Sequence, residues 1–172
     1  MSKKIWKKIL LIFGILFVLY NAVWSAYVVL RYEPFCKELG SEVGTGMDYL
    51  QRNGYTYSVH KPPYLSFTGN LSITENIVYK AESSETITVD LTIWPRGIDD
   101  YEVGVGIVQT TINYGTHSIN SICTQMMLDE SLNLLDNTPE NRKLYEENLD
   151  KIEKLYSLAY EIWGILELKQ GD

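Results

Sequence analysis

The sequence is poor in the residue types that most often carry chemistry. It contains only two histidines, His60 and His117, and neither has a cysteine, histidine or acidic residue at the spacing of a metal site. It also lacks a G-x-S-x-G nucleophile elbow, a phosphate-binding glycine loop and an H-E-x-x-H zinc motif. We therefore expect no metal ion and no cofactor, and an enzyme is the least favoured class of function.

Charged residues are absent from one long stretch near the start of the chain. Residues 9–30, ILLIFGILFVLYNAVWSAYVVL, contain no Asp, Glu, Lys or Arg over 22 consecutive positions. A helix of this length extends about 33 Å at about 1.5 Å per residue, which is enough to cross a hydrocarbon core of about 30 Å. The stretch therefore predicts a transmembrane helix that anchors the chain in a lipid bilayer.

The residues on either side of this run predict its orientation. Four lysines and no acidic residue lie within residues 1–8, whereas the flank after residue 30 has both signs of charge. Segments rich in Lys and Arg remain in the cytoplasm. We expect a plasma or inner membrane protein with a cytoplasmic tail at 1–8, a signal anchor at 9–30 and an extracytoplasmic domain at 31–172.

A cleaved signal peptide is the alternative interpretation of the same segment. Its apolar core would be residues 9–20, with a small-residue cleavage site near 23–25. The apolar run continues through residues 27–30, however, and cleavage would leave this stretch exposed at a new N-terminus. The length of the run therefore favours a retained anchor.

The domain expected at 31–172 is acidic. It contains all 22 acidic residues and 11 of the 15 basic residues. Nucleic acid and anionic lipid surfaces would repel such a domain, so neither is expected as its partner. The acidity keeps the domain soluble and is compatible with a cationic partner.

The two cysteines, Cys36 and Cys123, are compatible with an extracytoplasmic disulfide. A bridge between them would close a long loop and lower the entropy of the unfolded chain. Two buried free thiols are the alternative. The sequence does not give the Cα separation that distinguishes the two.

The residues from 55 to 114 have the two-residue alternation of β-strands. The clearest strand is 86–94, in which Ile87, Leu91 and other apolar residues point to one side. We predict four further strands, at residues 55–60, 64–68, 73–81 and 101–114. Alternation of this kind indicates an antiparallel meander of about five strands with one buried face.

Local features refine this prediction. Residues 82–85 have the length of a hairpin loop, and 94–97 have Pro95 at the second position of a turn. The apolar phase changes at residues 107–108, after Gly104 and Gly106, which we interpret as a β-bulge.

The polar sides of these strands carry hydroxyl groups. The simplest interpretation is a face exposed to water, and a docking surface for a protein partner is the alternative. The candidate interaction face consists of Thr56, Thr68, Thr74, Thr86, Thr88 and Thr92.

We predict helices before and after the sheet. Residues 35–52 have apolar residues at helical spacing, and Pro34 predicts a break between this helix and the membrane segment. A second helix is expected at 119–135. A third should begin at Thr138-Pro139-Glu140, which combines a capping hydroxyl, proline at the first helical position and an early acidic residue. The apolar band of this third helix predicts packing on the sheet, and its short heptad pattern permits a partner helix instead.

The sequence thus predicts an α+β domain carried by a membrane helix. The favoured function is a non-catalytic interaction or accessory domain that binds a protein partner or a second copy of itself. A sensor or small-ligand-binding module is the alternative, and it would require convergent polar groups in a pocket lined by some of the 13 Tyr and 4 Trp residues.

Overall fold

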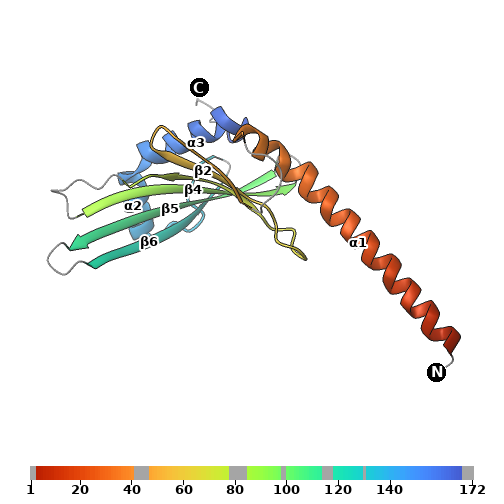
Figure 1. Ribbon diagram of the computed structural model, residues 1–172. Helices are drawn as coiled ribbons and strands as arrows, with labels where there is room; N and C mark the ends of the chain where they lie inside the picture. Colours follow the sequence, from red (N-terminus) through yellow and green to blue (C-terminus); the bar gives the residue numbers. More distant parts are fainter. Residues whose placement is uncertain are drawn as a thin grey trace.

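The computed structural model describes residues 3–40, 47–77, 85–97, 100–113, 118–129 and 131–167. These residues form a long helix, an antiparallel sheet with strand order β1-β2-β3-β4-β5-β6, and two further helices (Figure 1). The predicted α+β fold is confirmed, with six strands in place of about five. The elements are α1 (Lys3–Glu38), β1 (Met47–Arg52), β2 (Tyr55–His60), β3 (Asn70–Glu75), β4 (Glu85–Gly97), β5 (Asp100–Asn113), β6 (Ser118–Leu128), α2 (Pro139–Glu147) and α3 (Leu149–Trp163).

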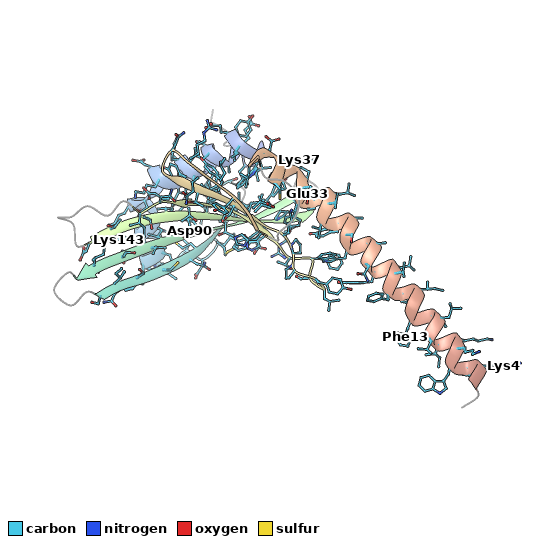
Figure 2. The ribbon with its side chains drawn as sticks, viewed as in Figure 1. Lys4, Phe13, Glu33, Lys37, Asp90 and Lys143 are labelled. Carbon is cyan, nitrogen blue, oxygen red and sulfur yellow. The ribbon has the colours of Figure 1, made fainter. Side chains whose placement is uncertain are left out.

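Helix α1 extends away from the rest of the molecule. Among the described residues it is the one helix long and apolar enough to cross a membrane, and its most apolar stretch is not buried in the structure. Figure 2 shows Phe13 far from the sheet and Glu33 close to it. A helix of this kind suggests membrane anchoring.

The break expected at Pro34 is absent, because α1 continues to Glu38. Proline removes one helical hydrogen bond, and its ring crowds the preceding turn. In α1 this cost is offset by packing, since Tyr32, Phe35 and Cys36 are buried in the core on either side of the exposed Pro34. The last turns of α1 therefore belong to the domain.

Strand β4 is the centre of the sheet and confirms the clearest strand prediction. Its side chains alternate, so Val89, Leu91 and Ile93 are buried while Thr92 is only partly covered. Leu91 pairs with Ile73 on one side and with Val105 on the other. The core thus forms on one face of the sheet, as the alternation predicted.

Helices α2 and α3 confirm the third predicted helix, with a break at Asn148. Thr138 accepts a hydrogen bond from the Asn141 backbone N–H (3.2 Å), as expected for the capping residue. The apolar band of α3, including Ile152 and Tyr156, is buried in the core. The alternative use of this band for a partner helix is therefore not needed to explain it.

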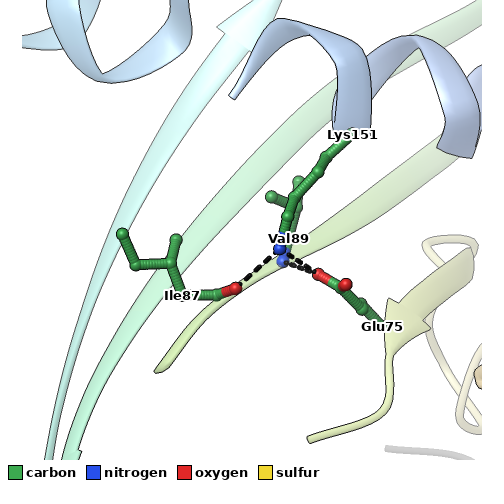
Figure 3. A network of polar contacts seen from close by, with 4 residues as sticks. All are labelled: Glu75, Ile87, Val89 and Lys151. Carbon is green, nitrogen blue, oxygen red and sulfur yellow. Dashed lines mark hydrogen bonds and ion pairs between the residues drawn. The ribbon is translucent and has the colours of Figure 1, made fainter. Parts of the chain in front are cut away.

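A polar network joins α3 to the sheet beyond the last β3–β4 pair (Figure 3). The Lys151 ammonium donates to Glu75 Oε2 (2.8 Å) and to the Ile87 carbonyl (2.7 Å). The same carboxylate oxygen accepts from the Val89 backbone N–H (3.3 Å). The side chain of Glu75 thus accepts the hydrogen bond from Val89 that the backbone of a paired strand would otherwise accept.

Two of the predicted helices are wrong. Residues 35–52 contain the end of α1 and strand β1, and residues 119–135 contain strand β6 followed by a short loop. Strand β6 pairs with β5 from Val103↔Leu128 to Asn113↔Ser118. Tertiary pairing overrides a weak local helical pattern when a long neighbouring strand offers hydrogen bonds along its whole edge.

Other local predictions also need correction. Residues 64–68 belong to the loop between β2 and β3, which we call the aromatic loop (residues 61–69). The register of β5 is continuous through residues 107–108, so the predicted bulge is absent, and the irregularity lies between Pro95 and Gly97 at the end of β4. The predicted turn at 94–97 is therefore strand. Residues 78–84, which include most of the hairpin loop predicted at 82–85 and the end of the strand predicted at 73–81, lie outside the described residues, and Glu85 begins β4.

Candidate functional site: the uncovered face of the sheet

Within the described ranges, one face of the sheet has no helix packed against it. Helix α3 contacts β4, and α1 contacts β2, on the side where the apolar residues are buried. Figure 1 shows α3 along this side of the strands. We call the other side the uncovered face; on β4 its residues are Thr86, Thr88, Asp90, Thr92 and Trp94.

The structure places five of the six predicted threonines on the uncovered face. Thr74 is exposed, whereas Thr88 is only 6% exposed among its neighbours. Thr68 is the exception, because it lies in the aromatic loop. The five are Thr56, Thr74, Thr86, Thr88 and Thr92.

Hydroxyl groups on this face hydrogen bond to one another across strands. Ser58 and Ser72 are directly paired residues, and their Oγ atoms are 2.7 Å apart. Thr110 and Ser121 are related in the same way at 3.0 Å. Because these hydroxyl groups form hydrogen bonds with one another, they do not all need a water molecule as a partner.

Two glycines of β5 make room for large side chains of β4. A Cβ atom at Gly104 would lie 2.9 Å from the Trp94 ring and 3.3 Å from Met127 Sδ, and a Cβ at Gly106 would overlap the Asp90 carboxylate. Gly104 and Gly106, which precede the predicted bulge at 107–108, instead allow Trp94 and Asp90 to lie across the strand.

A cavity of about 550 Å³ lies at the end of the uncovered face nearest α1. It brings together α1, the aromatic loop and the ends of β4 and β6. Arg96 forms an ion pair with Glu102 at its edge. The residues lining the cavity are Tyr27, Phe67, Thr68, Gly69, Trp94, Pro95, Arg96, Glu102 and Met127.

Asp90 is a partly buried carboxylate in the middle of this face (Figure 2). Burial raises its pKa above the ordinary value of 3.8, because the surrounding protein removes water from the charged form. Burial, followed by the charge of Asp90, also raises the pKa of the Cys123 thiol. The local environment therefore disfavours additional negative charge.

The structure does not support the predicted disulfide. Cys36 and Cys123 are free thiols. Cys36 is buried in the core on the helix side, whereas Cys123 is exposed on β6 beside Asp90 on the opposite face. The sheet separates the two residues, so its two faces would have to rearrange before a bond could form.

A cluster of buried charges joins α1 to the sheet. The Lys61 ammonium lies 3.0 Å from Glu33 Oε1 and 3.1 Å from Asp48 Oδ2, and all three side chains are less than 10% exposed. The Asp48 contact is an ion pair without hydrogen-bond geometry at Oδ2. Burial, followed by a hydrogen bond with Asp48, raises the pKa of the Cys36 thiol to about 12. The cluster is closed from solvent and positions elements; it offers no opening for a substrate.

Sequence reasoning found the alternating face but missed the cavity and the charge cluster. The residues of each come from segments far apart in the chain, so no short motif identifies them. In the part of the chain that the structure describes, no group of three or more His, Cys, Asp or Glu residues is arranged to hold a metal ion. His60 lies half-buried at the end of β2, and His117 is outside the described residues.

No family model, curated protein or solved structure matches this chain.

Proposed function

We propose that the protein is a single-pass, membrane-anchored interaction domain that binds a protein partner through the uncovered face. Residues 31–172 are extracytoplasmic and residues 1–8 cytoplasmic in this proposal. The observation that carries it is the arrangement of the sheet, which is packed against helices on one side only. An antiparallel sheet with one free face is a common platform for contacts.

The anchoring part of the proposal is supported by α1. Its exposed side chains include Phe13 (66%) and Val18 (65%), and such apolar surface is unfavourable in water. The lysine-rich start favours a cytoplasmic tail. An impermeant maleimide added to intact cells should label a Lys154→Cys variant in a Cys123→Ser background if the domain is extracytoplasmic, because Lys154 is exposed on α3 away from the uncovered face. Labelling only after lysis would reverse the orientation.

The binding part is supported by the exposed side chains of the uncovered face. Tyr49 and Ile119 are 62% and 60% exposed, near opposite edges of the sheet. Tyr is among the residues that most often dominate the binding energy of an interface, and the contacts around such a residue exclude water. The acidic domain is compatible with a cationic partner.

Photo-crosslinking in the native membrane tests this assignment. A photoreactive residue replaces Thr74 or Tyr49 on the uncovered face, and Lys154 on the exposed side of α3 serves as the matched control. We expect a defined crosslinked product from Thr74 and Tyr49 and none from Lys154. Two differently tagged copies of the chain distinguish self-association from another partner. Equal products from all positions, or none from the uncovered face, would overturn the proposal.

Small-ligand binding is a second candidate, and the cavity beside Trp94 favours it. Its volume of about 550 Å³ is within the usual range of ligand sites, and its lining combines aromatic side chains with Arg96 and Glu102. A ligand that raises the melting temperature of the full-length protein, but not that of a Gly104→Leu variant, would support this function.

A further inference from the structure

We propose that the aromatic loop is a second membrane contact, with its tip at residues 64–67 inserted into the lipid leaflet on the domain side. This inference rests on the proposed membrane anchor. The loop extends from the sheet toward α1 (Figure 1). The lipid is that of the same bilayer that α1 would cross.

The aromatic loop is bonded directly to the apolar part of α1. Trp24 Nε1 donates to the Ser66 carbonyl (2.9 Å), and the Tyr27 hydroxyl donates to the Phe67 carbonyl (2.9 Å). The Tyr64 hydroxyl donates to Asn21 Oδ1 (3.0 Å). These contacts fix the loop beside residues that belong to the charge-free run.

Aromatic rings pack along the same contact. Tyr20 meets Tyr64 and Phe67 with ring centroids 6.1 and 6.2 Å apart, both edge to face. Trp24 meets Tyr64 at 5.4 Å, and Tyr27 meets Phe67 at 5.2 Å. Tyr and Trp side chains gather where hydrocarbon meets water, because their rings are apolar and their N–H and O–H groups are polar.

The position along α1 at which the aromatic loop makes contact gives the depth of the loop in the bilayer. Lys8 is the last charged residue before the apolar run. At about 1.5 Å per residue, Asn21 lies about 20 Å and Tyr27 about 28 Å beyond Lys8. Since the hydrocarbon core is about 30 Å thick, residues 21–27 lie in its last third or at its boundary. The loop beside them must therefore reach the same depth.

Several backbone N–H groups of the aromatic loop have partners within the protein. Pro62 and Pro63 have no N–H group, and the Ser66 N–H donates to the Pro63 carbonyl (2.9 Å). The Thr68 N–H donates to Ser66 Oγ (3.1 Å), and the Gly69 N–H to the Tyr32 hydroxyl (3.0 Å). These bonds lower the cost of placing Ser66, Thr68 and Gly69 near lipid, where an unpaired backbone N–H is costly.

Three of the four side chains at the tip are largely apolar, and none of the four is charged. Leu65 is 70% exposed, and Tyr64 and Phe67 are 48% and 42% exposed. Leu65 also has a φ of +70°, a conformation that Leu rarely adopts. The only charged residue of the loop is Lys61, whose ammonium is held by Glu33 and Asp48. Contact with lipid accounts for the exposure of these three apolar side chains.

Insertion of the loop would fix the domain against the bilayer at two points. A single helix leaves the carried domain free to tilt, whereas the helix and loop together prevent this. Phe67 and Tyr27 also line the cavity at the end of the uncovered face. The mouth of that cavity would then lie at the lipid surface.

Fluorescence quenching in phosphatidylcholine vesicles tests this inference with the full-length chain. A Leu65→Cys variant in a Cys123→Ser background is labelled with the polarity-sensitive dye NBD. Leu65 makes few contacts, so its replacement should be tolerated, and the Cys123→Ser parent measures labelling of buried Cys36. Matched variants carry the dye at Phe13, within α1, or at Lys154, on the exposed side of α3.

We expect lipids with a doxyl group high on the acyl chain to quench the dye at Leu65 several-fold more than at Lys154. Aqueous iodide should show the opposite order. Deep doxyl lipids should quench at Phe13, which tests the anchor separately. If doxyl lipids quench the dye at Phe13 while iodide quenches the dye at Leu65, the loop inference alone would be overturned. Failure of quenching at Phe13 would overturn the anchor as well. A dye at Leu65 shielded only in native membranes would assign the loop to a protein partner and overturn lipid contact.

Discussion

The Lys61 ammonium lies 3.0 Å from Glu33 Oε1, and both side chains are 8% exposed. Lys61 follows β2, and Glu33 lies near the end of α1. Asp48 of β1 adds a second carboxylate at 3.1 Å from the same ammonium. The position of the domain on its helix therefore depends on a buried ion cluster as well as on apolar packing.

Replacement of Lys61 by methionine should strongly destabilise the domain. The change leaves two buried carboxylates without their cation, and breaking a buried pair costs about 3–5 kcal/mol. Urea unfolding in detergent measures the loss. Lys143→Met is the control, since that side chain is 77% exposed and should change stability by less than about 0.5 kcal/mol. Adding Glu33→Gln and Asp48→Asn to Lys61→Met should recover part of the loss; no recovery would contradict the ion-cluster explanation.

Stability should fall as the pH rises above 9. Burial raises the pKa of Cys36 from 9.0 to about 12 and that of Tyr32 from 10.0 to about 12. The unfolded chain then releases these protons before the folded chain does, so alkali favours unfolding. The same sign holds for Lys61: burial lowers its pKa, but the carboxylates of Glu33 and Asp48 beside the ammonium outweigh this and raise the pKa above 10.5.

The Cys36→Ala variant isolates the first of these groups. Of these three groups, Cys36 is the one that mainly ionises in the unfolded chain between pH 9 and 10. Its ionisation lowers the free energy of unfolding by up to about 1.4 kcal/mol per pH unit. Urea midpoints at pH 8, 9 and 10 should therefore fall less steeply in Cys36→Ala than in the parent protein. An identical slope would show that Cys36 does not remain a thiol in the fold.

Asp90→Asn should stabilise the protein at neutral pH. Burial raises the pKa of Asp90, so stability falls as the pH rises above 3.8, where the unfolded carboxyl ionises, and the full loss is present above the folded pKa. The melting temperature of Asp90→Asn should exceed that of the parent at pH 7, and the difference should shrink as the pH falls toward 3.8. Glu153→Gln, at an exposed position of α3, should show no such gain. A destabilised Asp90→Asn protein at pH 7 would indicate that the carboxylate has a favourable partner.

Leu91→Asp should prevent folding of the domain. Leu91 is fully buried on the core side of β4, and an unpaired carboxylate there costs several kcal/mol. Leu91→Met conserves volume and should cost less than about 1.5 kcal/mol. Gln51→Asp, exposed on the uncovered face, should change stability by no more than about 0.5 kcal/mol. Circular dichroism and urea unfolding of the three variants would reveal an inverted assignment of faces if Leu91→Asp remained folded.

Local patterns determined three parts of the structure. The charge-free run at 9–30 gives the long apolar helix, the alternation at 86–94 gives β4, and Thr138-Pro139 gives the start of α2. Each of these patterns depends only on residues that lie close together in the sequence. The threonines of the uncovered face follow from the same alternation, because every second side chain of a strand points to one side.

Tertiary structure decided the elements whose partners are distant. Residues 118–128 have helical spacing at Ile119, Ile122 and Met126, but the free edge of β5 makes them a strand. Residues 47–52 become β1 because β2 follows them with a tight turn. In the same way, residues 64–68 are held as a loop by Trp24 and Tyr27, about 40 residues earlier.

The sequence by itself thus determined an apolar helix, an α+β domain and one polar side of a sheet. The tertiary structure alone decided that Cys36 and Cys123 lie on opposite faces, that Lys61 meets Glu33 and Asp48, and that a cavity forms beside Trp94. The physical reason is the range of the interactions. Alternation and helix caps act between near neighbours, whereas burial, ion pairing and cavity shape depend on segments that only the completed fold brings together.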